Sequence, residues 1–317
     1  MLRRLSTVIL LASLISSAGY AMSKVYLIKT EDRVAALQTL FKQIDLSSLK
    51  GKKVVIKPNF NSDDPFPATT HIDTLKTVIE ILKAHSPASV TIIERSGMGS
   101  TENILINRGA AALAKKEGVA LINLDKLERK YWVRKGDKGT HWLRGYLVPK
   151  VLLEADYVVN LPCLKTHRFG GDFTMSLKNN VGAIAKREGI YNYMWELHAS
   201  PSQRLMIAEI NKAIPCSLVV MDGIKAFADQ GPDKGKLIEP GVMLLSSDRI
   251  AIDAVGVAIL RSFGTTPKIS RGSIFELDQI KRAADLGIGV RSAEEIELIT
   301  ADPASEKIAD QIKSFLH

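Results

Sequence analysis

Cysteine is almost absent from this chain, which has only Cys163 and Cys216 among its 317 residues. Two thiols cannot form the four-thiolate set that holds an iron–sulfur cluster or a structural zinc ion. We therefore expect no iron–sulfur cluster in this chain and assign it no metal site. Both cysteines lie in apolar, strand-like segments, which favours buried free thiols over the disulfide that an oxidising compartment would allow.

Internal repeats, low-complexity segments and bilayer-length apolar runs are also lacking. The apolar run LSTVILLASLISS near the start is too short to span a bilayer comfortably. It follows Arg3 and Arg4 and precedes the small residues Gly19 and Ala21, the order found in signal peptides. Residues 1–21 are thus predicted to be a signal peptide of a periplasmic or secreted protein that is not integral to the membrane. The alternative is a cytoplasmic protein that starts at Met22.

The rest of the chain has an ordinary globular composition, with 46% hydrophobic and 24% charged residues. We expect residues 22–317 to form a single α/β domain. Apolar strand-like segments alternate with segments of helical spacing, a pattern typical of a mostly parallel sheet with helices on both faces. The strand-like segments are 24–30, 52–60, 89–94, 119–124, 158–161, 216–224 and 241–247.

Residues 125–150 break this pattern with eight Lys or Arg against three acidic residues, a net charge of 8 − 3 = +5. Tyr131, Trp132, Trp142 and Tyr146 are interleaved, and KGDKG is typical of a hairpin turn. We expect a basic β-hairpin insertion, solvated beside the main sheet. A substrate-facing or membrane-surface arm is the alternative. Nucleic acid is not an expected partner, because an exported protein rarely meets it.

Polar motifs follow several of the apolar strands directly, at the place where open parallel sheets bind ligands. These motifs are Lys57-Pro-Asn59, Arg95-Ser-Gly-Met-Gly, Lys165-Thr-His167 and Asp222-Gly223. After Lys165 and His167, a Gly-Gly break is predicted to lead into a helix that begins near Asp172. The long loop 225–240 has the glycines of a mobile lid. Cations gathered at one edge of a sheet are costly for folding, so they indicate an anionic ligand.

We assign catalytic roles to His167, Lys165 and Asp222, with His167 as a general base or, alternatively, a metal ligand or structural residue. His198 is a further candidate.

Ligand binding is assigned to Lys57, Asn59, Lys178, Asn179 and Asp253. Lys57 could instead be a surface lysine, and Lys178 could extend to solvent. Asp253 lies among apolar neighbours, so its carboxylate is expected to be buried beside a lysine.

The ordered motifs VVIKPN, LPCLKTH, SLKNNVG, MDGI and SSD..AIDAVG resemble those of the domain-of-unknown-function family 362, over roughly residues 53–260. The resemblance implies a shared α/β fold and a shared polar site but no established reaction. Many members carry a ferredoxin-type cysteine-rich module, which this chain lacks, and tend to have a lysine where this chain has Cys163.

Together these features predict an exported enzyme that acts on a small anionic substrate, a carboxylate or a phosphate, through Lys/His acid–base chemistry. A non-catalytic anion-binding protein is the first alternative, and a redox partner of a separate iron–sulfur protein is the second.

Overall fold

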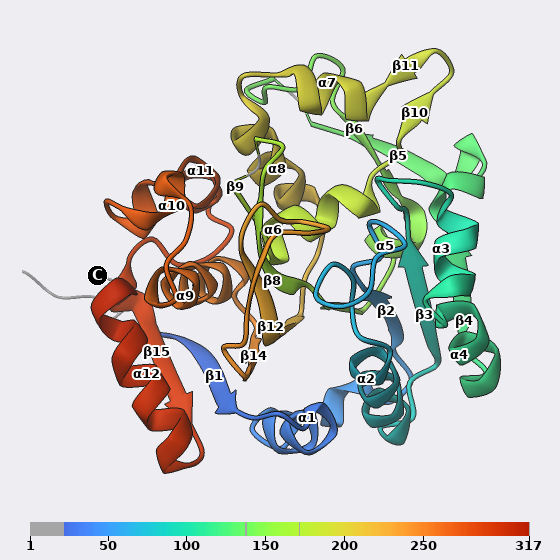
Figure 1. Ribbon diagram of the computed structural model, residues 1–317. Helices are drawn as coiled ribbons and strands as arrows, with labels where there is room; N and C mark the ends of the chain where they lie inside the picture. Colours follow the sequence, from blue (N-terminus) through green and yellow to red (C-terminus); the bar gives the residue numbers. More distant parts are fainter. Residues whose placement is uncertain (1–21, 137, 171, 317) are drawn as a thin grey trace, which may run out of the picture.

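A computed structural model describes residues 22–136, 138–170 and 172–316 (Figure 1). The predicted signal peptide, residues 1–21, lies outside the described residues, as does part of the predicted hairpin turn and of the Gly-Gly break. No helix in the described residues combines the length and the apolarity that crossing a bilayer requires.

A mixed sheet of eleven strands runs through the described part of the molecule. Its central path has the order β15-β1-β14-β12-β7-β2-β3-β4, with β13 and β8 paired to β12, and β9 to β8. The strands are β1 Ser23–Lys29, β2 Lys53–Lys57, β3 Ser89–Glu94, β4 Ala120–Asn123, β7 Tyr157–Asn160, β8 Cys163–His167, β9 Asp172–Thr174, β12 Leu218–Asp229, β13 Lys236–Ile238, β14 Val242–Ser246 and β15 Ile296–Thr300.

The run from β12 to β4 along this path is parallel, whereas β14 is antiparallel to both β1 and β12. Strand β12 extends to Asp229 and turns back into β13, so a hairpin occupies most of the segment predicted to be a mobile lid.

Helices cover both faces of the sheet, as the sequence predicted (Figure 1). The main helices are α1 Arg33–Phe41, α2 Ile72–Ala84, α3 Thr101–Asn107, α4 Ala110–Glu117, α5 Lys150–Leu153, α6 Ser176–Asn179, α7 Tyr193–Ala199, α8 Gln203–Ala213, α9 Arg249–Ser262, α10 Pro267–Ser270, α11 Asp278–Asp285 and α12 Pro303–Leu316.

Strand β12 shows why helices must cover both faces of the sheet. Val219 and Met221 pack into the core around α9, whereas Leu218 and Val220 pack into the core formed by α1 and α2. Successive side chains of a strand point to opposite faces, so a strand that is apolar at every position must be buried on both sides. The predicted α/β fold, mostly parallel with helices on both faces, is confirmed.

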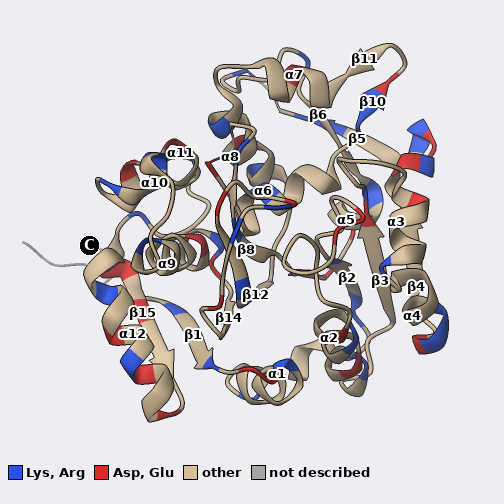
Figure 2. Ribbon diagram, in the orientation of Figure 1, with Lys and Arg blue, Asp and Glu red and all other residues tan. Residues whose placement is uncertain are grey.

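The basic insertion is a hairpin, formed by the antiparallel strands β5 Trp132–Lys135 and β6 Tyr146–Pro149. It is less solvated than predicted. Trp142 donates from Nε1 to the carbonyl of Met206 on α8 at 3.2 Å, and Tyr146 donates to the carbonyl of Glu209 at 2.9 Å. The aromatic side chains attach the hairpin to α8, while its basic segments lie outside (Figure 2).

The helix predicted to begin near Asp172 begins instead at Ser176. Residues 172–174 form strand β9, because Phe173 and Thr174 pair with Thr166 and Lys165 of β8. The four-residue helix α6 then continues into the 3₁₀ helix η4 Asn180–Ala183. Lys165 and His167, predicted in a turn, both lie in β8.

Candidate functional site

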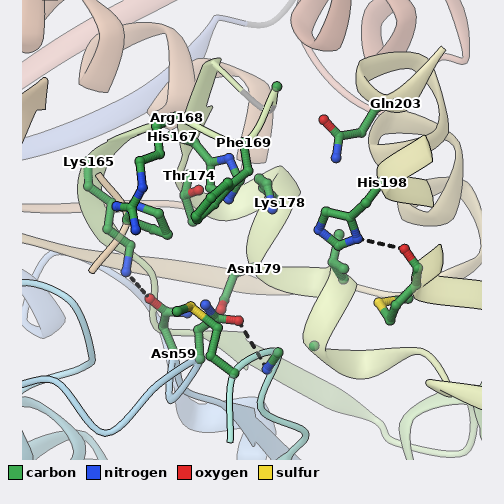
Figure 3. Close-up of a pocket in the computed structure, with 18 of the residues that line it drawn as sticks. Asn59, Lys165, His167, Arg168, Phe169, Thr174, Lys178, Asn179, His198 and Gln203 are labelled. Atoms are coloured by element: carbon green, nitrogen blue, oxygen red, sulfur yellow. Dashed lines mark hydrogen bonds between the residues drawn. The ribbon is translucent and has the colours of Figure 1, made fainter. Parts of the chain in front are cut away.

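A cavity of about 660 Å³ lies beyond the ends of strands β2 and β3 and beside β8. Its wall takes side chains from β2, β3, β8, β9, α6 and α7 and from the start of α8 (Figure 3). Seven of the predicted or candidate site residues line it: Lys57, Asn59, Lys165, His167, Lys178, Asn179 and His198. This volume is in the range of ordinary small-molecule pockets, roughly 300–1,000 Å³.

Lys57 is fully buried and forms an ion pair with Glu94, with Nζ 2.6 Å from Oε1. Glu94 also accepts hydrogen bonds from the backbone N–H groups of Phe60 and Arg95. Gly182 touches this pair, and a Cβ atom there would lie 2.9 Å from Lys57 Nζ. Lys57 therefore joins β2 to β3 across the cavity floor, and its charge is already neutralised.

Lys165 is buried but has no carboxylate partner in the part of the chain that the structure describes. It donates to Asn59 Oδ1 at 2.7 Å and to the carbonyl of Ala68. Because side chains alternate along a strand, Lys165 and His167 share one face of β8, and this face lines the cavity. Burial lowers the pKa of Lys165, and both neutral acceptors orient its amine.

Asn179 is held in one orientation. Its Nδ2 donates to Asn160 Oδ1 at 2.6 Å and to the carbonyls of Lys57 and Pro58 at 3.2 Å. Those bonds use the donors of the amide and leave Oδ1 without a partner among the described residues. Asn179 is thus a cavity-lining residue with a fixed, unpaired hydrogen-bond acceptor.

Several further polar atoms of residues that line this cavity are buried and have no partner among the described residues. They are His167 Nδ1, Thr174 Oγ1 and Gln203 Nε2, in addition to Asn179 Oδ1. Buried polar atoms without a partner cost about 1–3 kcal/mol each, so four such atoms on residues that line one cavity make it the candidate site.

The amine of Lys178, another residue that lines the cavity, also lacks a partner among the described residues. The side chain is 8% exposed, and its amine makes no hydrogen bond or ion pair with any described residue. Burial, followed by the charges of Lys165 and Arg95, lowers the pKa of Lys178 to about 7. Burial also holds the pKa of His167 well below its ordinary value, so its imidazole is neutral at neutral pH. Figure 3 shows both side chains at the same wall.

The charges around the cavity sum to a positive excess. Arg168 is paired with Asp233, and Arg204 with Asp172 and Asp278. Lys165, Lys178 and Arg95 have no carboxylate within ion-pair distance among the described residues. The guanidinium of Arg95 bonds instead to the carbonyls of Ile184 and Val181. A site with unneutralised cations favours an anionic ligand.

Asp222 does not line the cavity. It lies in the middle of β12, because that strand continues past it, and it accepts hydrogen bonds from Arg33 Nε at 2.7 Å and Thr74 Oγ1 at 2.8 Å. The structure thus brings it to α1 and α2 and away from His167.

Asp253 also lies outside the cavity, and the lysine partner expected for it is wrong. The carboxylate accepts from the backbone N–H groups of Ser176 at 2.7 Å and Leu177 at 3.0 Å, so it caps α6 from the neighbouring helix α9. Two amide donors satisfy a buried carboxylate without a cation. Burial still raises the pKa of Asp253 to about 7.

Sequence reasoning missed Glu94, Thr174, Gln203 and Arg168. Glu94 could have been predicted from the sequence. It ends a buried strand at the same edge of the sheet as Lys57, and a carboxylate in that place is an expected partner for the lysine. Thr174 was hidden by the helix predicted there. Gln203 and Arg168 could not be predicted as site residues from their local sequence, because only the packing of α8 and of the β12–β13 turn brings them to the cavity.

The two cysteines are both free, and Cys163 is buried in β8, where burial raises its pKa to about 12. Within the described ranges, no three His, Cys, Asp or Glu side chains gather in a way that could hold a metal ion.

Several solved structures resemble this chain distantly. A crystal structure of a Thermotoga maritima protein matches 65% of this chain and 52% of its own, with a TM-score of 0.43 and 15% identity. The lactate racemase apoprotein of Thermoanaerobacterium thermosaccharolyticum matches 92% of this chain and 86% of its own, with a TM-score of 0.40 and 14% identity.

A relative is found among characterised sequences in a thylakoid-associated protein of Synechocystis, which is 35% identical over 115 residues. The matched stretch covers 35% of this chain and 35% of that protein. The family model described as "Domain of unknown function (DUF362)" matches residues 54–258. This range includes β2, α6 and most of the cavity wall. The chain therefore belongs to the DUF362 family.

Proposed function

We propose that this cavity binds a small anionic substrate, a carboxylate or a phosphate, and that His167 and Lys178 move a proton on it. The observation that carries the proposal is the convergence of unpaired polar groups on one cavity. Asn179 Oδ1, Thr174 Oγ1, Gln203 Nε2 and His167 Nδ1, all on residues that line the cavity, are buried without protein partners among the described residues. The Lys178 amine, from the same wall, makes no hydrogen bond or ion pair with a described residue.

The charges around these groups favour an anion. Lys57 is neutralised by Glu94, but Lys165 and Arg95 are held by neutral acceptors and keep their positive potential toward the cavity. The Thr174 hydroxyl and the Gln203 amide can both donate to ligand oxygens. An anion would supply acceptors for these donors and offset the mutual repulsion of the cations.

The protonation states favour an enzyme over a binding protein. A neutral imidazole can accept a proton at neutral pH, and an amine with a pKa of about 7 can either donate or accept one. A protein that only bound an anion would gain most from a lysine that stays fully charged. Shifted pKa values in one cavity are typical of catalytic sites.

We also propose that the protein acts outside the cytoplasm. The support is the basic, apolar and small-residue order of residues 1–21.

Thermal melting with inorganic phosphate, L-lactate, L-malate and oxalate tests the binding part of the proposal. A ligand at about 100 times its Kd stabilises the folded state by about 2.7 kcal/mol, a readily measured rise in Tm. We expect at least one anion to raise the Tm of the parent and of Lys212→Met, which removes an exposed lysine on α8. The same anion should have little effect on Lys178→Met.

Hydrogen exchange in D₂O tests proton transfer. The parent should exchange a carbon-bound hydrogen of a bound acid for deuterium, which NMR detects. The His167→Gln variant should lose this exchange while it still binds the anion. Binding without exchange in the parent would favour the non-catalytic alternative. If no anion in the panel raises the parent's Tm, the proposed function is wrong.

A further inference from the structure

Lys178 differs in one respect from the other two buried lysines of the cavity. Lys57 is bonded to Glu94 and to the carbonyl of Pro58, and Lys165 is bonded to Asn59 and Ala68. The amines of Lys57 and Lys165 are therefore both held in place by hydrogen bonds to protein acceptors. The Lys178 side chain is 8% exposed, against 1% for Lys57 and 0% for Lys165, and its amine has no acceptor within the described structure. A lysine retained only for packing would gain stability by reaching one.

The surroundings of Lys178 keep much of its amine uncharged. Charged and titratable groups reach the cavity wall from several directions: Lys57 with Glu94, Arg95, Lys165, His167, Arg168 with Asp233, His198, and Arg204 with Asp172. The carboxylates in this set are paired with Lys57 and with the two outer arginines, so none neutralises Lys178. Only the neutral form of an amine is a nucleophile, and a neighbouring cation is a known way to favour that form.

We propose, building on the anion-binding function above, that the Lys178 amine captures the carbonyl group of a small oxo acid as an imine. The carboxylate of the acid would lie at the part of the cavity wall that Thr174 and Gln203 line, in the positive potential of Lys165 and Arg95. The carbonyl carbon would lie at the Lys178 amine. One molecule thereby accounts for both the anion preference of the cavity and its unpaired amine.

His167 lines the same cavity as Lys178, and its neutral imidazole has the protonation state that imine formation needs. The nitrogen lone pair of Lys178 attacks the carbonyl carbon, a C–N bond forms, and the carbonyl π electrons move to oxygen. His167 Nδ1 takes a proton from the attacking nitrogen and returns it to that oxygen, which gives a carbinolamine. The hydroxyl then leaves with the remaining N–H proton as water and the C=N bond forms. The net change is amine plus carbonyl to imine plus water, with no oxidant or reductant.

Reductive methylation tests the reactivity of the amine without assuming a substrate. The protein is treated briefly with formaldehyde and cyanoborohydride at pH 7, and each lysine is quantified by peptide mass spectrometry. A larger neutral fraction should make Lys178 react on the order of tenfold to a hundredfold faster than the exposed Lys212. Lys57 and Lys165 are internal controls, and we expect both to stay unmodified. If Lys178 labels no faster than they do, the imine proposal is overturned.

Trapping with oxo acids tests the substrate class. Pyruvate, glyoxylate, acetoacetate and 2-oxoglutarate are each added with cyanoborohydride to the full-length protein. We expect a stable adduct on Lys178 of the parent with at least one of these acids. The Lys212→Met variant should carry the same adduct on Lys178, and the Lys178→Met variant should carry none at residue 178. L-Lactate, which has the carboxylate but no carbonyl, should compete and lower the yield.

Failure of the imine proposal and failure of anion binding are distinguishable. If anions raise the Tm and no oxo acid in the panel leaves an adduct at residue 178, the cavity binds anions without imine chemistry. If adducts form only at exposed lysines, the imine proposal also falls. If no anion raises the Tm and L-lactate does not compete, the anion-binding function falls with it.

Discussion

At the scale of single residues, a marked effect of pH on stability is expected at Lys178. Its pKa is about 7 in the folded protein, below the ordinary value for lysine. Between that pH and about 10 the unfolded chain holds a proton that the folded chain does not, so stability rises with pH across this window. Below pH 7 both states are protonated and the full cost of burying the charge is present.

Lys178→Met should therefore stabilise the protein without ligand, by an amount on the order of a few kcal/mol at pH 6, because each pKa unit corresponds to about 1.4 kcal/mol. The stability that Lys178→Met adds should shrink as the pH approaches 10. Urea unfolding of the parent and the variant at pH 6, 8 and 10 measures this, with Lys212→Met as the control. A variant that is less stable than the parent at pH 6 would show that Lys178 has a structural partner.

At the scale of elements, the buried pair of Lys57 and Glu94 holds the ends of β2 and β3 together. Lys57→Met should cost about 3–5 kcal/mol, because it leaves the Glu94 carboxylate buried without a cation. The double variant Lys57→Met/Glu94→Gln should recover part of that loss. Guanidinium unfolding of the single and double variants measures both changes. A single variant as stable as the parent would contradict this structural role.

The short helix α6 depends in the same way on Asp253 of α9. Asp253→Ala should destabilise the protein by about 2 kcal/mol at pH 8, because two buried N–H groups lose their acceptor while the cost of burying the charge is relieved. Asp253→Asn keeps one acceptor oxygen and should lose less. Thermal melting at pH 8 compares the three proteins. Equal Tm values for Asp253→Ala and the parent would show that α6 needs no such cap.

At the scale of the whole molecule, the export prediction concerns residues 1–21. Protein recovered from cell fractions should lack these residues and begin near Met22 in a non-cytoplasmic fraction, which N-terminal sequencing can establish. An intact Met1, or a product that begins at Met22 and remains in the cytoplasm, would contradict export.

The alternation of apolar strands and helices was enough to predict the fold class, because which side chains a strand or helix buries is read from local periodicity. Periodicity failed at residues 172–184. Phe173, Leu177 and Val181 have helical spacing, but Phe173 and Thr174 satisfy their backbone by pairing with β8. A strand partner brought in from elsewhere in the chain outweighs a local helical pattern.

The sequence by itself determined which polar residues stand at the ends of apolar strands, and so identified Lys57, Asn59, Lys165 and His167 as candidates for one edge of the sheet. The tertiary structure decided which charges are neutralised. Lys57 meets Glu94, which is 37 positions away, and Asp253 meets backbone groups 76 and 77 positions away. Hydrogen bonds form only within a few tenths of an ångström of about 3 Å, and chain order does not specify such distances between remote segments. The same tertiary packing leaves the Lys178 amine without a partner among the residues that the structure describes.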